Sequence, residues 1–63
     1  MEEILKADHD QTMKDLEKMA RLVEAVQADE RKNAHYAISL QSVRNLEQIE
    51  KLSKAIRGRM KRD

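Results

Sequence analysis

The sequence is poor in the residues that build disulfides, turns and strands. It has no cysteine and no proline, its only glycine is Gly58, and its only aromatic residue is Tyr36. The lack of cysteine excludes disulfides and thiolate metal sites, and it suits the reducing cytoplasm, where we expect the protein. Strands depend on aromatic and β-branched residues, and a phosphate-binding loop needs several glycines. Both features are therefore unexpected here.

Long apolar runs and catalytic constellations are missing too. No segment approaches the roughly 20 apolar residues that span a bilayer, and the acidic start Met1-Glu2-Glu3 does not suit a secretion signal. His9 and His35 have no neighbours at metal-ligand spacing, and no nucleophile lies beside a base and an oxyanion donor. We expect no enzyme activity, no cofactor, no metal and no small-molecule substrate.

Helix-forming residues dominate what is present. The chain has 63 residues, of which 40% are hydrophobic and 40% are charged, which is typical of exposed amphipathic helices. This length allows one domain with a small core, and small domains without disulfides or metals often rely on oligomerisation. The composition predicts an all-α protein that associates with copies of itself.

Mostly apolar residues follow two stripes with heptad spacing, and a few polar residues occupy positions within them. Each stripe is typical of a helix that packs against another helix. The first stripe comprises Leu5, His9, Thr12, Leu16, Met19, Val23 and Val26. The second comprises Ile38, Ser42, Asn45, Ile49, Leu52 and Ile56. Their registers differ by two residues, or about 200° around a helix, so one straight helix would present the two stripes on opposite sides.

A turn between the stripes resolves this mismatch. We expect a helix over about residues 2–28, a turn over about 29–33 with Asp29 or Asn33 as a cap, and a helix over about 34–57. Residues 1–57 would then form a single antiparallel hairpin domain, and Gly58 would stop the second helix before a frayed basic tail over 58–63. One long helix in a coiled-coil oligomer is the alternative, because the turn segment lacks glycine and proline.

A lone hairpin has only one narrow contact, or seam, between its two helices. We therefore expect two hairpins to form a four-helix bundle. The predicted self-association core is Leu5, Leu16, Met19, Val23, Val26, Ile38, Asn45, Ile49, Leu52 and Ile56. Asn45 is a candidate for fixing the register of the helices. The hairpin would also bring Glu2 and Glu3 beside Arg57 and Arg59.

The chain resembles the Rop family of plasmid RNA-binding hairpin dimers. The resemblance consists of two near-equal predicted helices, the length of the chain and the residues Ala28-Asp29-Glu30 at the predicted junction. It implies a four-helix bundle. The RNA-binding face of that family includes a phenylalanine on the first helix, which this chain lacks.

Two surfaces are candidates for binding other molecules. Tyr36, Leu40 and Val43 share one face of the second predicted helix and form a candidate protein-binding patch. Six basic residues lie in the last 13 positions and could contact phosphate groups; they are Lys51, Lys54, Arg57, Arg59, Lys61 and Arg62. We expect an adaptor, inhibitor or assembly factor that binds a protein. A nucleic-acid-binding regulator is the alternative, and a membrane-surface role is disfavoured by Glu47 and Glu50.

Overall fold

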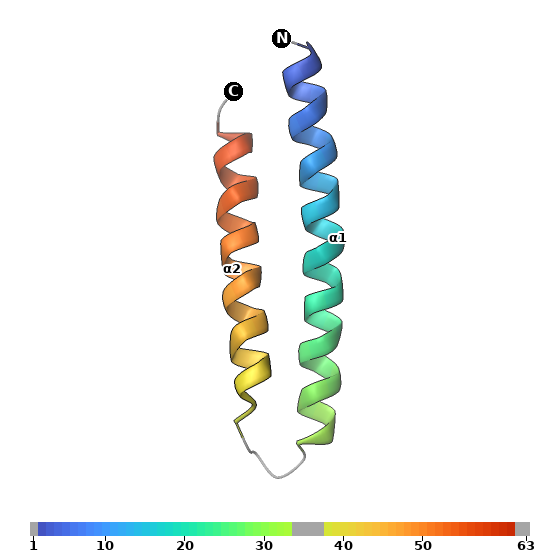
Figure 1. The fold of residues 1–63 in the computed structure, drawn as a ribbon, viewed down its shortest axis with the longest axis vertical. Coiled ribbons are helices and arrows are strands. Elements are labelled where there is room, and N and C mark those ends of the chain that lie inside the picture. Colours follow the sequence, from blue (N-terminus) through green and yellow to red (C-terminus); the bar gives the residue numbers. More distant parts are fainter. Residues whose placement is uncertain (1, 34–37, 62–63) are drawn as a thin grey trace.

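The computed structural model describes residues 2–33 and 38–61, with only the backbone of Glu2. Helix α1 (Glu2–Lys32) and helix α2 (Leu40–Met60) lie side by side and run in opposite directions (Figure 1). The molecule measures 52 × 15 × 12 Å between Cα atoms. The prediction of an all-helical hairpin is therefore confirmed, and the described residues do not form one continuous helix.

The connection lies later in the chain than the sequence predicted. Helix α1 continues through the predicted turn to Lys32, and the N–H of Asn33 donates to the carbonyl oxygen of Asp29 at 3.0 Å. Arg31 and Lys32 form the last turn, where basic side chains interact favourably with the helix dipole. The predicted turn at residues 29–33 was wrong because the charged residues 29–32 complete the helix.

Helix α2 also begins later than expected, at Leu40 rather than near residue 34. Ser39 is its N-cap, with φ −93° and ψ 118°, and the Ser39 hydroxyl accepts the backbone N–H of Ser42 at 3.2 Å. A serine in this position satisfies one of the N–H groups that the first turn leaves unpaired. The cap is therefore neither Asp29 nor Asn33.

Gly58 lies inside helix α2 instead of ending it. The helix reaches Met60, and Lys61 caps it in an ordinary right-handed conformation, with φ −77° and ψ −10°. The Lys61 N–H donates to the carbonyl oxygen of Arg57 at 2.9 Å. The predicted tail over 58–63 is thus helical through Met60, and residues 62 and 63 lie outside the described part of the chain.

This placement of Gly58 gives a stability prediction. A Cβ atom added at Gly58 would have no atom within 4 Å, so alanine fits without a clash. We expect Gly58→Ala to raise the free energy of unfolding by about 0.5–1 kcal/mol, because glycine is the poorer residue inside a helix. Thermal unfolding followed by circular dichroism measures this change. If Gly58 ended the helix, as the sequence suggested, the same substitution would destabilise the protein.

The seam between the helices is formed by heptad positions on both. On α2 the seam residues are Ser42, Asn45, Ile49, Leu52, Ile56 and Arg59, which match the second predicted stripe except at its ends. On α1 they are Asp8, Thr12, Asp15, Met19, Leu22, Val26 and Asp29, and Asn33 follows directly after the helix. Of the first predicted stripe, only Thr12, Met19 and Val26 are in this seam.

Candidate functional site

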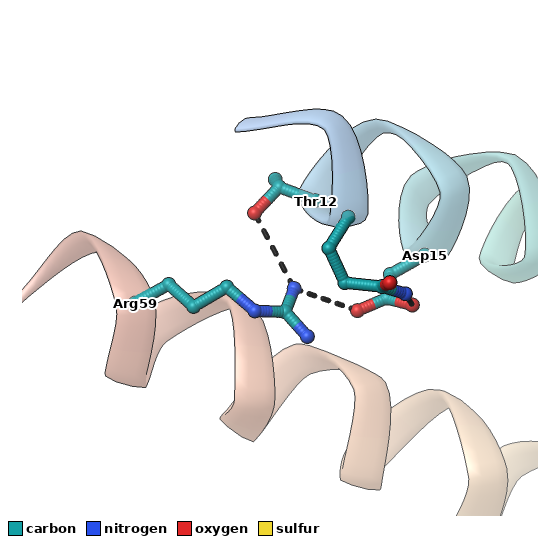
Figure 2. A network of polar contacts seen from close by, with 4 residues as sticks. Thr12, Asp15 and Arg59 are labelled. Atoms are coloured by element: carbon teal, nitrogen blue, oxygen red, sulfur yellow. Dashed lines mark hydrogen bonds and ion pairs between the residues drawn. The ribbon is translucent and has the colours of Figure 1, made fainter. Parts of the chain in front are cut away.

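A polar cluster joins the helices near the free end of the hairpin. Nη1 of Arg59 donates to Oδ2 of Asp15 at 2.7 Å and to Oγ1 of Thr12 at 3.4 Å (Figure 2). Gln11 donates through Nε2 to Oδ1 of Asp15 at 3.0 Å. Both carboxylate oxygens of Asp15 therefore have a donor. We call Thr12, Asp15 and Arg59 the open-end cluster.

A second polar cluster joins the helices next to the connection. The hydroxyl groups of Ser39 and Ser42 both donate to Oδ2 of Asp29, from Ser42 at 2.7 Å. Asp29 belongs to the last turn of α1, and the two serines belong to the start of α2. We call Asp29, Ser39 and Ser42 the turn-end cluster. Of its members, Asp29 was predicted to lie in the turn, and Ser39 and Ser42 were predicted to lie in the second helix.

Hydrogen bonds lower the pKa of both cluster aspartates below the ordinary value of 3.8. For Asp15 the main cause is the hydrogen bond from Arg59, followed by that from Gln11. For Asp29 the hydrogen bond from Ser39 contributes most, followed by that from Ser42. In both cases donors that favour the ionised carboxylate outweigh burial, which opposes it.

The lowered pKa values predict how the hairpin responds to acid. A carboxyl group whose pKa is lower in the folded state stabilises that state above its unfolded pKa, and this contribution disappears as pH falls through the folded pKa. Asp15→Asn and Asp29→Asn should therefore reduce the drop in thermal midpoint between about pH 5 and about pH 2. Asp10→Asn, which changes an exposed residue of α1, is the control. Equal acid sensitivity in all variants would contradict the prediction.

The seam between the two clusters is mostly apolar. The contacts from Thr12 to Arg59 and from Asp29 to Ser42 fix an antiparallel register, in which Met19 and Leu22 lie near the level of Leu52 and Ile49. All four of these side chains are half-buried. The hairpin therefore has a short apolar centre with a hydrogen-bonded cluster at each end.

Asn45 occupies a buried position of α2 near the turn end. Its Oδ1 accepts from Nε2 of Gln41, one turn earlier, at 3.2 Å. Its place in the seam agrees with the prediction for this residue, whereas a role in fixing the register stays a prediction.

The predicted self-association core divides into two groups. Asn45 and Ile56 are buried and Met19, Val26, Ile49 and Leu52 are half-buried, all in the seam, whereas Leu5, Leu16, Val23 and Ile38 are exposed. The last four side chains do not pack between the two helices of one hairpin. Asp15 and Asp29 occupy positions of α1 that face α2, because each makes hydrogen bonds to α2 residues in one of the two clusters. The four exposed side chains remain predictions for association between chains.

The candidate binding residues are only partly placed by the structure. Leu40 and Val43 are exposed, as expected, and Tyr36 lies outside the described residues. Lys51, Lys54, Arg57 and Lys61 are exposed, whereas Arg59 points inward to Asp15, and Arg62 lies outside the described residues. Arg59 therefore pairs with Asp15 and does not lie beside Glu3, because α1 extends beyond the end of α2. The side chain of Glu2, which was predicted to lie beside the same bases, is outside the described part of the structure.

Sequence reasoning missed Asp15, Leu22 and Asp29 as seam residues. A search for apolar stripes passes over the two aspartates. A signal was present, however, because all three occur at a spacing of seven residues, each three positions after Thr12, Met19 or Val26. An acidic residue that repeats with a heptad seam is a candidate for a contact across it.

The described residues form neither a membrane-spanning helix nor a metal-binding group. Neither α1 nor α2 combines the length and the apolar character needed to cross a membrane. Residues 2–33 and 38–61 contain no group of three or more histidine, aspartate or glutamate side chains that could hold a metal ion. The junction residues Ala28-Asp29-Glu30, which suggested the Rop family, lie within α1. Comparison with protein-family models, curated proteins and solved structures found no significant match.

Proposed function

We propose that this chain is a small non-enzymatic interaction module that acts as a homo-oligomer by packing its helices against other helices. The simplest assembly is a dimer of hairpins in a four-helix bundle. Such a module serves as an adaptor, an inhibitor or an assembly factor that binds a target protein, in the cytoplasm. The observation that supports this proposal best is the large surface that the single hairpin leaves exposed.

The hairpin exposes 5498 Å². A compact globular protein of 7.4 kDa would expose about 4,200 Å². The surplus of about 1,300 Å² exceeds the roughly 800 Å² that each partner buries in a standard protein interface. One hairpin therefore has enough uncovered surface for a stable interface.

The interior of the single hairpin is correspondingly small. Ile56 is the only hydrophobic residue that is buried among the described residues, and ten large hydrophobic side chains are exposed. Exposed apolar surface of this extent is typical of interaction sites. Association would bury it and would supply stability that the apolar centre of one hairpin does not provide.

The molecular mass in solution tests the proposal. Sedimentation equilibrium should give twice the 7.4 kDa mass of one chain. The thermal midpoint should rise with protein concentration, because dissociation accompanies unfolding in an obligate dimer. A stably folded monomer, with a midpoint independent of concentration, would contradict the proposal.

Nucleic-acid binding is the second candidate function. Lys54 and Arg57 of α2 and its C-cap Lys61 are all exposed and share one face, at spacings of three and four residues. Such a stripe can contact phosphate groups through charge alone. If it does, changing all three to glutamine should abolish salt-dependent binding to RNA or DNA in fluorescence anisotropy and leave helix content unchanged. Wild-type protein that binds neither nucleic acid would remove this candidate.

A further inference from the structure

Most of the exposed hydrophobic residues gather on one side of the hairpin. In the part of the chain that the structure describes, ten large hydrophobic side chains are exposed. Eight of them lie along one flank of the seam or at its two ends; they are Leu5, Met13, Leu16, Val23, Ile38, Val43, Leu46 and Met60. Only Ile4 and Leu40 lie elsewhere.

Two hollows mark this flank. The first, at the open end, is lined by Leu5, Asp8, His9, Thr12, Arg59 and Met60. The second, next to the connection, is lined by Val26, Glu30, Ile38, Ser39, Ser42, Val43 and Leu46. Each hollow is shared by both helices, so it can receive a side chain from a partner that covers the seam from this side.

Heptad spacing places both hollows on the same flank. Along α1, His9 lines the first hollow and Glu30 lines the second, and Leu16 and Val23 fall between them at intervals of seven residues. Positions seven residues apart share one side of a helix in a two-helix seam. Leu16 and Val23 therefore join the two hollows along α1.

Helix α2 repeats this arrangement. Leu46 lines the second hollow and Met60 lines the first, with Ser53 midway between them at the same interval. Val43 also lines the second hollow, and Glu50 and Arg57 follow it at intervals of seven residues. We call the side of the hairpin that carries these residues of α2 the apolar flank. On α1 the same side carries His9, Leu16, Val23 and Glu30.

The opposite flank is different in character. Its positions on α1 are Ile4, Gln11, Lys18, Ala25 and Lys32, and those on α2 are Gln41, Gln48 and Ala55. Amide, lysine and alanine side chains dominate this flank, and neither hollow opens on it. One side of the seam is thus suited to water and the other to a partner.

We propose that the apolar flank is the surface on which a second copy of this chain docks, flank to flank, with the open end of each hairpin beside the turn end of the other. The inference rests on the proposed function and adds the face and the orientation. The surplus of about 1,300 Å² per chain is enough for such a dimer, since it exceeds the roughly 800 Å² that a standard interface covers on each partner.

Charge supports the reversed orientation. Lys6 lies seven residues before Met13 and therefore shares its flank. On the apolar flank the exposed bases Lys6 and Arg57 lie towards the open end, and the exposed acid Glu30 lies at the turn end. Reversed packing places the bases of one copy near Glu30 of the other, whereas parallel packing gathers like charges at each end. The same reversal sets His9 opposite Glu30 of the second copy and Leu16 opposite its Val23.

The orientation predicts which residues meet their own copies. Ala20 lies seven residues after Met13, so it is on the apolar flank, midway between His9 and Glu30 along α1. Glu50 lies midway between Ser39 and Met60 along α2. In a two-fold symmetric, reversed dimer, both lie near the symmetry axis. Glu50 then faces Glu50 of the second copy, and this repulsion should weaken the dimer slightly.

Cysteine substitution tests the contact directly, because the natural chain has no cysteine. Under mild oxidation Ala20→Cys should give a covalent dimer, since disulfides form only when the two Cα atoms are within about 7 Å. Ala25→Cys, an exposed position on the opposite flank of the same helix, is the matched control and should stay uncrosslinked. A covalent product formed only when Ala20→Cys is mixed with Glu50→Cys would overturn the orientation.

Charged substitutions test whether the apolar flank forms the contact between the two copies. Leu16→Glu with Leu46→Glu should weaken dimerisation by at least on the order of tenfold, because each carboxylate would be buried against apolar side chains. The control is Ala25→Glu with Ala55→Glu, both exposed on the opposite flank, which should leave the mass unchanged. Glu50→Gln should tighten the dimer about twofold. Sedimentation equilibrium at matched concentrations measures all three.

The outcomes separate this inference from the proposed function. A wild-type dimer that survives Leu16→Glu with Leu46→Glu and gives no Ala20→Cys product overturns the flank but leaves the homo-oligomer standing. A wild-type monomer overturns both. Capture of a different protein on the apolar flank, without self-association, would also overturn the inference.

Discussion

Ile56→Ala should lower the free energy of unfolding by about 2–4 kcal/mol, because it creates a cavity at the one buried hydrophobic side chain of the described seam. Ile56 is 6% exposed. A chain of 63 residues is expected to be stable by only about 3–9 kcal/mol in total. The substitution should therefore remove a large share of the stability, and thermal or urea unfolding at a fixed protein concentration measures it.

The control for this experiment is the same substitution at an exposed isoleucine. Ile4 is 59% exposed, lies near the start of α1 and is not on the apolar flank. Ile4→Ala should change the stability by no more than about 0.5 kcal/mol. Equal losses at the two positions would mean that Ile56 does not anchor the seam.

Asn45→Leu should raise the free energy of unfolding by about 1–2 kcal/mol, since a buried amide is replaced by an apolar side chain of similar size. Asn45 is 8% exposed and receives a hydrogen bond from Gln41. The apolar centre would then extend by one more position towards the turn end. A buried asparagine in a helical seam often limits the register at some cost in stability.

The gain in stability should therefore be accompanied by the loss of a single register between the two helices. Chemical denaturation measures the stability, and the number of backbone amide signals in a nuclear magnetic resonance spectrum reports how many registers coexist. Gln48→Leu, at an exposed position of α2, is the control and should leave both unchanged. A less stable Asn45→Leu protein with a single set of signals would show that the hydrogen bond outweighs the cost of burying the amide.

The helical hairpin was predictable from the sequence because two stripes out of phase favour a chain that reverses over one long helix. The stripe of α2 from Ser42 to Ile56 was correct, since its branched apolar residues mark the seam unambiguously. The turn was misplaced because charge was taken as a sign of a loop. The residues from Asp29 to Lys32 are compatible with either state, and the decisive features are the cap at Ser39 and the basic last turn of α1.

The polar contacts of the seam could not be predicted in the same way. The position of Asp15 depends on a guanidinium group 44 residues away, and no local pattern connects the two. Leu16 and Val23 were assigned to a core and are exposed on the single hairpin. The apolar pattern indicates which side chains are suited to burial. Whether they are buried within the hairpin or against a partner depends on the pairing of polar groups that are distant in the sequence.

The two clusters also limit how the molecule can change in length. Inserting one heptad into α1 between Asp15 and Asp29 would keep every side chain on its original face. It would still separate one aspartate from its donors, because Arg59 and Ser42 remain at a fixed spacing on α2. A longer descendant of this hairpin would therefore need matched insertions in both helices, so that duplication of a whole seam layer is easier to accommodate than a change in either helix alone.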